Sequence, residues 1–368
     1  MKKTKNRRLG PNGKQKLISS QLRKDIHAGT LVPGEKLPAR IEFEARYECG
    51  PVTIQNAFDK LKEDGSIITN GNKGTFVSEN PPCLTTYAIV FPFDPEMLNT
   101  EISFYGTLAK LAREDTKNTN CRFIIYTDIN GHKDKKNYIR LFRDVVSESL
   151  AGIIFATPPH NIDRTELLQE LISRKYLPKV VMMANMVDYP DFSKINSPTE
   201  NFINKIFNFL ESKSIKRLSV LNALTDKSQL LPYEKEIFAE AKKRKIELPK
   251  YNFQSRSSTY ASRSDEIVHL MLSKVKNERP QALWVTNDTL VEGALKGVVD
   301  AGLNVPDDLL VVSHYNFPDN PETSSFETFC YGLNVRVFID TSVDIIRNHR
   351  KIDNKPCVRN IPIEYHLG

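Results

Sequence analysis

Apolar residues recur at helical spacing in the first part of the chain, and the clearest case is residues 50–64. There, Ile54, Ala57, Phe58 and Leu61 stand at positions i, i+3, i+4 and i+7, which places them on one face of a helix. Two stretches before it show similar spacing. The pattern therefore predicts three helices, over residues 14–28, 39–48 and 50–64.

A hairpin signal follows the third predicted helix. Short apolar runs at residues 67–69 and 75–77 flank Asn-Gly-Asn-Lys-Gly, residues 70–74, which is rich in the residue types that turns between strands require. Three helices followed by such a hairpin predict a winged helix-turn-helix domain of the α+β class.

The third predicted helix has a second side that suits contact with DNA bases. Val52, Thr53, Gln55 and Asn56 lie away from the apolar stripe in its first two turns. Side-chain amides can pair with adenine edges in the major groove, and the methyl groups of Val and Thr can touch thymine. We therefore interpret residues 50–64 as a recognition helix.

The pattern changes after a polar, proline-rich segment at residues 78–86, which we interpret as a boundary between domains. Beyond it, short apolar runs alternate with helical stretches, as is typical of parallel sheets covered by helices on both faces. The predicted strands are residues 87–91, 122–126, 152–156, 179–183, 217–221, 249–253, 282–286 and 309–313. The predicted helices are residues 101–115, 134–149, 165–175, 199–212, 233–245, 260–276 and 289–301. This succession predicts two doubly wound α/β lobes, in which ligands bind at the carboxyl ends of strands.

Charge is distributed unevenly along the chain. Residues 1–80 hold 15 Lys and Arg against 9 Asp and Glu, a net charge of +6, whereas the whole chain carries +7. Nine of those basic residues precede the first acidic residue, Asp25. A basic segment beside a candidate recognition helix favours contact with DNA phosphates. We expect residues 1–13 to be a disordered basic arm.

The composition, with 40% hydrophobic and 26% charged residues, is typical of a soluble globular protein. The longest apolar runs have the length of strands, which excludes a transmembrane helix. Because no apolar segment follows the basic N-terminus, we expect no signal peptide and a cytoplasmic protein. The five cysteines are scattered without a C-x-x-C pair, which favours reduced thiols.

The sequence contains no recognisable catalytic or metal-binding motif. There is no P-loop, no G-x-G-x-x-G, no G-x-S-x-G and no H-E-x-x-H, and the seven histidines lack metal-ligand spacing. We therefore expect no enzymatic activity, no cofactor and no metal.

Residues 15–77 resemble the GntR-type DNA-binding domain throughout. Residues 31–38 follow its L-x-P-G-x-x-L-P turn, the recognition helix follows V-T-x-x-x-A-x-x-x-L-x-x-x-G, and residues 71–77 are similar to its wing. Arginines that read guanine in relatives are absent here, which favours A/T contacts through Gln55 and Asn56. The pattern and the resemblance together predict the following DNA-binding residues: Arg40, Val52, Thr53, Gln55, Asn56, Lys60, Asn72, Lys73 and Gly74.

Residues 284–313 resemble the LacI-type effector domain, which is similar to periplasmic sugar-binding proteins. Less distinctive segments in the same order extend the resemblance over about residues 87–368. It implies two lobes joined by several crossovers, an effector cleft between them, and dimerisation. Where relatives have Gly-Phe-Asp-Asp after the last motif strand, this chain has Ser-His-Tyr-Asn at residues 313–316.

Residues near the ends of predicted strands are the candidate effector ligands. Asn287 and Asp288 stand between a strand and a helix, where Asn and Asp are also favoured as helix caps. The resemblance implies that Asp288 accepts hydrogen bonds from ligand hydroxyls. The next strand is followed by His314, Tyr315 and Asn316. The other candidates are Phe93, Asp94, Asn196 and Asn222, at comparable positions, and Arg256, which could clamp an anionic or hydroxylated ligand.

The sequence thus predicts a cytoplasmic, homodimeric transcription regulator, a repressor, that binds operator DNA and a small effector, expected to be a carbohydrate. Its predicted parts are the arm at residues 1–13, the winged domain at 14–78, a linker at 79–86, and the two-lobed effector-binding and dimerisation domain at 87–368. The alternative is a solute-binding protein of a transport system on the same two-lobed fold, which would need export. An enzyme on an α/β fold would need a catalytic motif that the sequence lacks.

Overall fold

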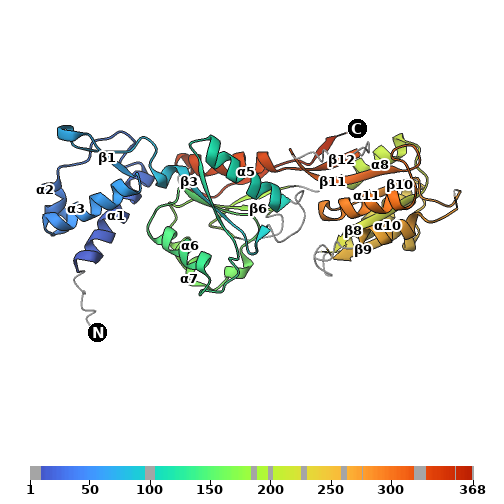
Figure 1. Cartoon of the computed structure of the whole chain (residues 1–368), viewed down its shortest axis with the longest axis horizontal. Helices are drawn as coiled ribbons and strands as arrows, with labels where there is room; N and C mark the ends of the chain where they lie inside the picture. Colours follow the sequence, from blue (N-terminus) through green and yellow to red (C-terminus); the bar gives the residue numbers. More distant parts are fainter. Residues whose placement is uncertain are drawn as a thin grey trace. The chain divides into compact units, whose positions relative to one another are not determined.

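The computed structural model (Figure 1) divides the chain into two compact units. Unit 1 comprises residues 1–94, 111–196 and 340–359, and unit 2 comprises residues 95–110, 197–339 and 360–368. The residues that the structure describes are 10–95, 104–183, 189–197, 202–224, 230–257, 263–275, 277–318, 329–352 and 354–366. Residues 1–9 of the predicted arm lie outside the described residues. The helix expected from residue 14 already begins at Pro11, so the last part of the predicted arm is helical instead.

Unit 1 begins with the winged helix-turn-helix domain that the sequence predicts. Its elements are α1 (Pro11–Ala28), α2 (Arg40–Tyr47), α3 (Pro51–Glu63), β1 (Ile67–Thr69), the 3-10 turn η1 (Gly71–Lys73) and β2 (Thr75–Val77). The two strands pair antiparallel, with Ile67 opposite Val77. The predicted stripe on α3 is buried, because it packs against Ile18, Leu22 and Phe43 from the first two helices.

The segment predicted as a polar linker contains a short helix, α4 (Pro82–Thr85), and the next strand begins directly after it. Cys83 of α4 is fully buried in the core of the winged domain. The connection is therefore partly ordered by the burial of this side chain.

The rest of unit 1 is built on a six-stranded sheet in the order β13-β7-β6-β5-β3-β4. Its strands are β3 (Thr86–Val90), β4 (Arg122–Tyr126), β5 (Gly152–Phe155), β6 (Lys179–Met182), β7 (Ser193–Asn196) and β13 (Val358–Asn360). The pairs from β4 through β7 are parallel, as predicted. Figure 1 shows α6 (Lys136–Val146) and α7 (Glu166–Ser173) on one side of this sheet and α5 (Phe104–Asn118) on the other.

Unit 2 is built on a second six-stranded sheet, in the order β14-β12-β11-β10-β8-β9. Its strands are β8 (Leu218–Leu224), β9 (Phe253–Ser257), β10 (Ala282–Val285), β11 (Leu310–Phe317), β12 (Phe329–Asn334) and β14 (Glu364–His366). All pairs are parallel except β12 with β14. The helices of unit 2 are α8 (Phe202–Ser212), α9 (Leu230–Lys243), α10 (Ser264–Leu272) and α11 (Val291–Asp300). Two helices are divided between the units: α12 (Val335–Asn348) belongs to unit 1 from Asp340 on, and α5 belongs to unit 1 from Leu111 on.

The centre of unit 2 is held by Trp284 on β10. Its side chain is fully buried, as expected from its mid-strand position, and its indole nitrogen donates a hydrogen bond to the Tyr331 hydroxyl at 2.9 Å. The backbones of β11 and β12 approach each other closely at Gly332, where a Cβ atom would lie 1.7 Å from the carbonyl oxygen of Tyr315. A glycine is therefore required where β12 passes β11.

Three details of the strand prediction are wrong. Residues 250–252 form the 3-10 turn η4 (Lys250–Asn252), and β9 starts only at Phe253. The strand expected at residues 309–313 continues to Phe317 as β11. Eight strands are too few, because β7, β12, β13 and β14 were missed, as was the long helix α12. Several of these strands are short and lie at or near sheet edges, where a polar surface hides the strand pattern.

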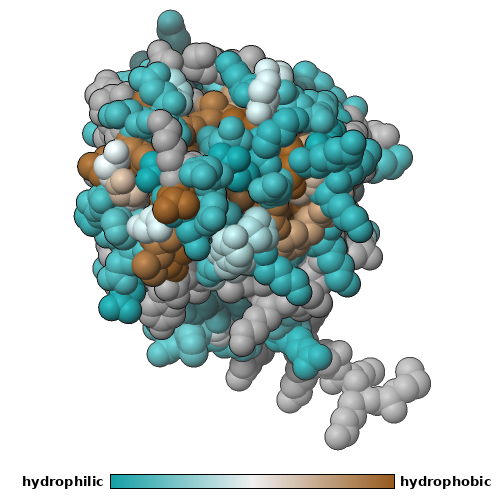
Figure 2. Space-filling view, turned by 90° about the vertical axis from the view of Figure 1, so that its right-hand side faces the viewer, coloured by the Kyte–Doolittle hydropathy of each residue, from teal (hydrophilic) through white to brown (hydrophobic). Residues whose placement is uncertain are grey.

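Among the described residues, no helix combines the length and hydrophobicity needed to cross a membrane. Figure 2 shows one face of the molecule, where hydrophilic side chains dominate and hydrophobic ones form separate patches between them. Such scattered apolar groups are ordinary on protein surfaces.

Candidate DNA-binding and effector-binding sites

The recognition helix α3 has one buried and one exposed face. Ile54, Phe58 and Leu61 are at most 1% exposed, whereas Val52 is 70% exposed and Asn56 is also exposed. Because the buried stripe anchors the helix, the opposite face must remain available to a partner. That face carries the predicted base-reading residues.

Two amides on this helix differ in their surroundings. The Gln55 side chain donates a hydrogen bond to the Asp59 carboxylate at 2.6 Å, and Lys62 lies 3.6 Å from the same carboxylate. The Asn56 side chain is exposed, while its backbone oxygen accepts a hydrogen bond from Gln15 at 3.1 Å. Asp59 was missed at the sequence level. Its position four residues after Gln55 on a helix could have predicted this contact, because side chains four residues apart are neighbours on a helix surface.

The other predicted DNA-binding residues surround this face. Arg40 is exposed in the first turn of α2, Lys60 is exposed on α3, and Thr53 is half-buried. In the wing, Asn72 and Lys73 are exposed in η1, and Gly74 ends the turn at φ +115°, a conformation that favours glycine. Sequence reasoning missed one further cation. The Lys36 side chain lies against Gly74, so Lys36 adds positive charge beside the wing.

In unit 2, polar residues meet where the strand order reverses, between β8 and β10. The Asn222 side-chain oxygen accepts a hydrogen bond from the Thr286 hydroxyl at 2.7 Å, and its amide nitrogen donates to Ser255 at 3.4 Å. Thr286 follows β10 directly. Crevices at such switch points are where open α/β sheets bind ligands.

Asp288 is the most connected member of this cluster. One carboxylate oxygen accepts hydrogen bonds from the Phe104 backbone N–H at 3.1 Å and from the Asn316 amide, and the other accepts from the Thr289 N–H at 3.0 Å. Asn287 also accepts from the Thr289 N–H, at 3.1 Å, as an N-cap. Asn287 is therefore the N-cap of the 3-10 turn Asp288–Leu290, while Asp288 lies inside that turn and accepts from the N–H of Phe104, the first residue of α5. Contact between Asp288 and an effector stays a prediction.

The three residues expected after a strand lie inside it, because β11 is longer than predicted. Their side chains consequently alternate between the two faces of the sheet. Tyr315 is 1% exposed and packs in the core of unit 2, so the expectation of a loop position for it is corrected. His314 is half-buried, its ring lies edge-on to Tyr331 at 5.5 Å, and burial lowers its pKa while the nearby Asp288 opposes this shift. Asn316 reaches Asp288.

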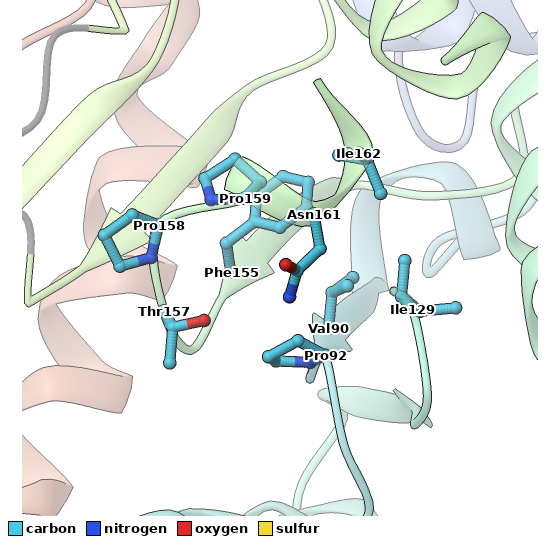
Figure 3. A pocket seen from close by; sticks show the side chains of 9 residues that line it. All are labelled: Val90, Pro92, Ile129, Phe155, Thr157, Pro158, Pro159, Asn161 and Ile162. Atoms are coloured by element: carbon cyan, nitrogen blue, oxygen red, sulfur yellow. The ribbon is translucent and has the colours of Figure 1, made fainter. Parts of the chain in front are cut away.

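The corresponding switch point of unit 1 lies between β3 and β5. A cavity of about 10 Å³, room for about one water molecule, lies at the carboxyl ends of these strands (Figure 3). Among its apolar lining, Thr157 and Asn161 are polar residues that sequence reasoning missed. Both residues follow β5. Their place after a predicted strand could therefore have identified them, as it did the other candidates.

The remaining predicted residues are placed as follows. Phe93 and Asp94 are half-buried after β3. Asn196 ends β7, and its side-chain oxygen is buried without a hydrogen-bond partner among the described residues. Arg256 lies in β9, paired through its backbone with Ala223; its side chain lies outside the described part. Among the described residues, no group of three or more His, Cys, Asp or Glu could hold a metal ion.

Two family models match the chain. The model "Bacterial regulatory proteins, gntR family" matches residues 14–77, and "Periplasmic binding protein-like domain" matches residues 217–326. A DNA-binding domain of this family followed by such a domain defines a transcription regulator. The chain thus carries a GntR-family DNA-binding domain at its N-terminus and a periplasmic-binding-protein-like domain after it.

Similar proteins agree with this class. The chain is 20% identical over 302 residues to the arabinose metabolism transcriptional repressor of Geobacillus stearothermophilus, and the match covers 79% of each chain. The fold is similar to that of a LacI family transcriptional regulator from Enterococcus faecium with bound ribose, with a TM-score of 0.56 and 13% identity. The match covers 77% of this chain and 97% of that chain. A LacI family regulator from Lactobacillus casei, with bound glucose, gives a TM-score of 0.54 at 14% identity, with 77% and 98% covered.

Proposed function

We propose that the protein is an operator-binding repressor whose activity responds to a small carbohydrate. The observation that carries this proposal is the cluster of Asn222, Thr286, Asp288 and Asn316 at the strand ends of unit 2, in a chain that also bears a GntR-family domain. Amide, hydroxyl and carboxylate groups are the partners that sugar hydroxyls require. Bound ribose and glucose in proteins of similar fold support the same ligand class.

The proposed mechanism is thermodynamic linkage. A sugar that binds one conformation of the effector domain more tightly shifts the population towards that conformation. If the two conformations hold the winged domains of a dimer differently, sugar affinity and operator affinity become coupled, each changing the other by the same factor. We propose a cytoplasmic homodimer that needs no cofactor, metal or catalytic residue. Its parts are the arm (1–13), winged domain (14–78), linker (79–86) and effector and dimerisation domain (87–368).

A solute-binding protein of a transport system is the less favoured reading. The relatives described above are transcription regulators, and residues 14–77 match a DNA-binding family. An enzymatic role has no support from the relatives either.

The test combines a thermal-shift screen with gel shifts. A panel of pentoses, hexoses and disaccharides is screened for a rise in melting temperature, because a ligand that binds only the folded state stabilises it. The sugar found is then added to gel shifts with the protein's own upstream DNA. We expect one sugar class to raise the melting temperature and to change operator affinity. Absence of specific DNA binding would overturn the assignment as a regulator, whereas DNA binding that no sugar changes would overturn the carbohydrate class.

A further inference from the structure

A cavity of about 220 Å³ lies within unit 1, where α1 of the winged domain meets the segments that precede β5 and β6. This volume is far above the roughly 10–15 Å³ that one water molecule needs. The polar part of its lining consists of His27, Tyr176, Arg347 and His349, and the rest is apolar. It belongs to neither of the strand-end sites described above.

The two histidines that line this cavity are both buried, at 4% exposure each. His27 comes from α1, and its Nε2 lies 3.1 Å from the carbonyl oxygen of Ala151. His349 comes from the turn after α12, and its Nε2 lies 3.2 Å from the carbonyl oxygen of Lys175. Its Nδ1 has no hydrogen-bond partner among the described residues. Because an unpaired buried nitrogen costs free energy, this atom calls for a partner that the cavity can supply.

Arg347 places a permanent positive charge at the rim of the cavity, where its side chain is exposed. Its Nε donates a hydrogen bond to the Tyr87 hydroxyl at 3.2 Å, and one Nη donates to the Cys121 sulfur at 3.0 Å. These contacts hold the guanidinium in place. The planar fork of a guanidinium matches the oxygens of phosphate and carboxylate groups.

The charged groups around the cavity leave an excess of positive charge. Lys179 lies close enough to His349 to lower its pKa, and Lys24 lies over the Tyr176 ring at 5.0 Å. Glu148 is engaged by the Tyr176 hydroxyl and by Arg174 at 3.1 Å, and burial raises its pKa. Two further carboxylates act on the cations: Asp344 on Arg347 and Asp191 on Lys179. The cavity thus favours an anionic occupant.

We propose that this cavity binds a small phosphate-type oxyanion, which Arg347 holds at the rim and which accepts a hydrogen bond from Nδ1 of protonated His349. His27 completes the wall from the winged domain. The site is therefore whole only while α1 is docked on the sheet of unit 1. Bound anion would stabilise that docked arrangement, independently of any sugar at the strand ends.

Proton uptake should accompany anion binding. Burial, together with the charge of Lys179, lowers the pKa of His349, while the contact with the Lys175 carbonyl opposes this shift. The anion favours the charged imidazole and raises its pKa again. Bound anion should therefore raise the pKa of His349, whereas the pH dependence of the affinity also reflects the ionisation of phosphate itself.

The test is calorimetry of the full chain with inorganic phosphate, in chloride buffer at constant ionic strength. At a fixed pH we expect saturable binding that is at least tenfold weaker in His349→Gln and in Arg347→Gln. His132→Gln, which changes an exposed histidine of the same unit, should bind like the wild type. The same titration is repeated with glycerol phosphate. Binding of either compound supports the site, and the compound that binds more tightly shows whether the ligand is free phosphate or a phosphomonoester.

If the variants fail to fold, an NMR titration of the histidines in the wild-type protein tests the same site. In the wild type, saturating phosphate should raise the pKa of His349, while the ring signals of His132 at a fixed pH should not move. Absence of saturable binding of both phosphate species, wild-type affinity in both cavity variants, or an unchanged His349 pKa would each overturn the proposal.

Discussion

The guanidinium of Arg23, on the first helix of the winged domain, donates a hydrogen bond to the backbone carbonyl of Ser147 at 3.0 Å, although the two residues are 124 positions apart. Arg23 is 4% exposed and also pairs with Asp64, the C-cap of the recognition helix. One buried cation therefore joins the end of the recognition helix to the loop that precedes β5. Through these contacts the winged domain is attached to the segments around the sheet of unit 1.

Arg23→Gln should weaken the docking of the winged domain. It removes the partner of a partly buried carboxylate, and the free energy of unfolding should fall by roughly 1–3 kcal/mol, the range for a buried polar group left unsatisfied. Urea unfolding measures the loss, and limited proteolysis at residues 78–86 should become faster. Lys16→Gln, an exposed change on the same helix, is the control. Equal stability of the two variants would show that this contact does not stabilise the unit.

Asn56 and Gln55 should contribute unequally to base recognition. Asn56→Ala should weaken binding to the cognate operator by roughly 1–3 kcal/mol, the range for one good bidentate base contact, and leave random DNA nearly unaffected. Gln55→Ala should cost less, because Asp59 already engages this amide. Asp59→Ala, which removes a negative charge from the exposed face, should tighten binding to all DNA. Gel shifts on operator and random duplexes distinguish these outcomes, and equal losses on both duplexes would identify phosphate contacts instead.

Phe58→Ala serves as the stability control for the recognition helix. Phe58 is 1% exposed and meets the Phe43 ring edge-on at 5.2 Å. Its loss should lower the free energy of unfolding of the winged domain by roughly 3–5 kcal/mol, as for other buried aromatic side chains. A smaller loss would mean that the stripe is less important for folding than its burial indicates.

The basic arm should add affinity without sequence preference. Deletion of residues 2–8 removes five positive charges. Binding to operator and random DNA should weaken by similar factors, and the dependence of log affinity on log salt should become shallower, because fewer counterions are released. Titrations at several salt concentrations measure the slope. An unchanged slope would mean that the arm does not contact phosphates.

Asp288→Asn tests the effector site. The amide keeps one side-chain oxygen for the hydrogen bonds to Phe104 or Thr289, so the protein should fold. Sugar affinity should fall by roughly 1.5–3 kcal/mol, the range for a hydrogen bond to a charged group, while operator binding without sugar stays near wild type. Asp300→Asn, the same change at the exposed end of α11, is the control. Unchanged sugar affinity in calorimetry would leave Asp288 as a helix cap alone.

Lys179 should make stability depend on pH in alkaline solution. Burial lowers its pKa to about 8, and the ammonium donates to the carbonyls of Leu171 and Arg174 at 2.9 and 3.0 Å. In the unfolded chain the pKa is about 10.4, so between these values the unfolded state binds more protons and stability rises with pH. The expected gain is on the order of 2–3 kcal/mol from pH 8 to pH 10.4.

Lys179→Met should lose this gain, and Lys175→Met, an exposed neighbour, should keep it. Urea unfolding at a series of pH values compares the three proteins. A gain that persists in Lys179→Met would belong to other groups.

The sequence by itself determined the winged domain and the class of the domain that follows it. The recognition helix and the wing are encoded within short segments: the helix by the apolar stripe from Ile54 to Leu61, and the wing by its turn residues. Local spacing therefore predicts both without knowledge of the rest of the fold. The succession of apolar strands and helices likewise indicates parallel sheets, because a strand covered on both faces must be apolar throughout. The position of Asp288 after a strand was visible for the same reason, whereas Asn222, which was expected to follow its strand, lies inside β8 because that strand continues to Leu224.

Only the tertiary structure decided which of these residues meet. Asp288 reaches Phe104 and Asn316 because strands and helices distant in sequence converge at one edge of the sheet, and no local period encodes that convergence. Tyr315 is buried because β11 continues past the predicted end. Side chains along a strand point alternately to its two faces, and that of Tyr315 points into the core. Arg23 and His27 acquire their contacts with Ser147 and Ala151 only when the winged domain docks on the sheet of unit 1, and His349 meets Lys175 only once the segments around that sheet are packed. Burial and pairing of polar groups depend on the whole surrounding fold.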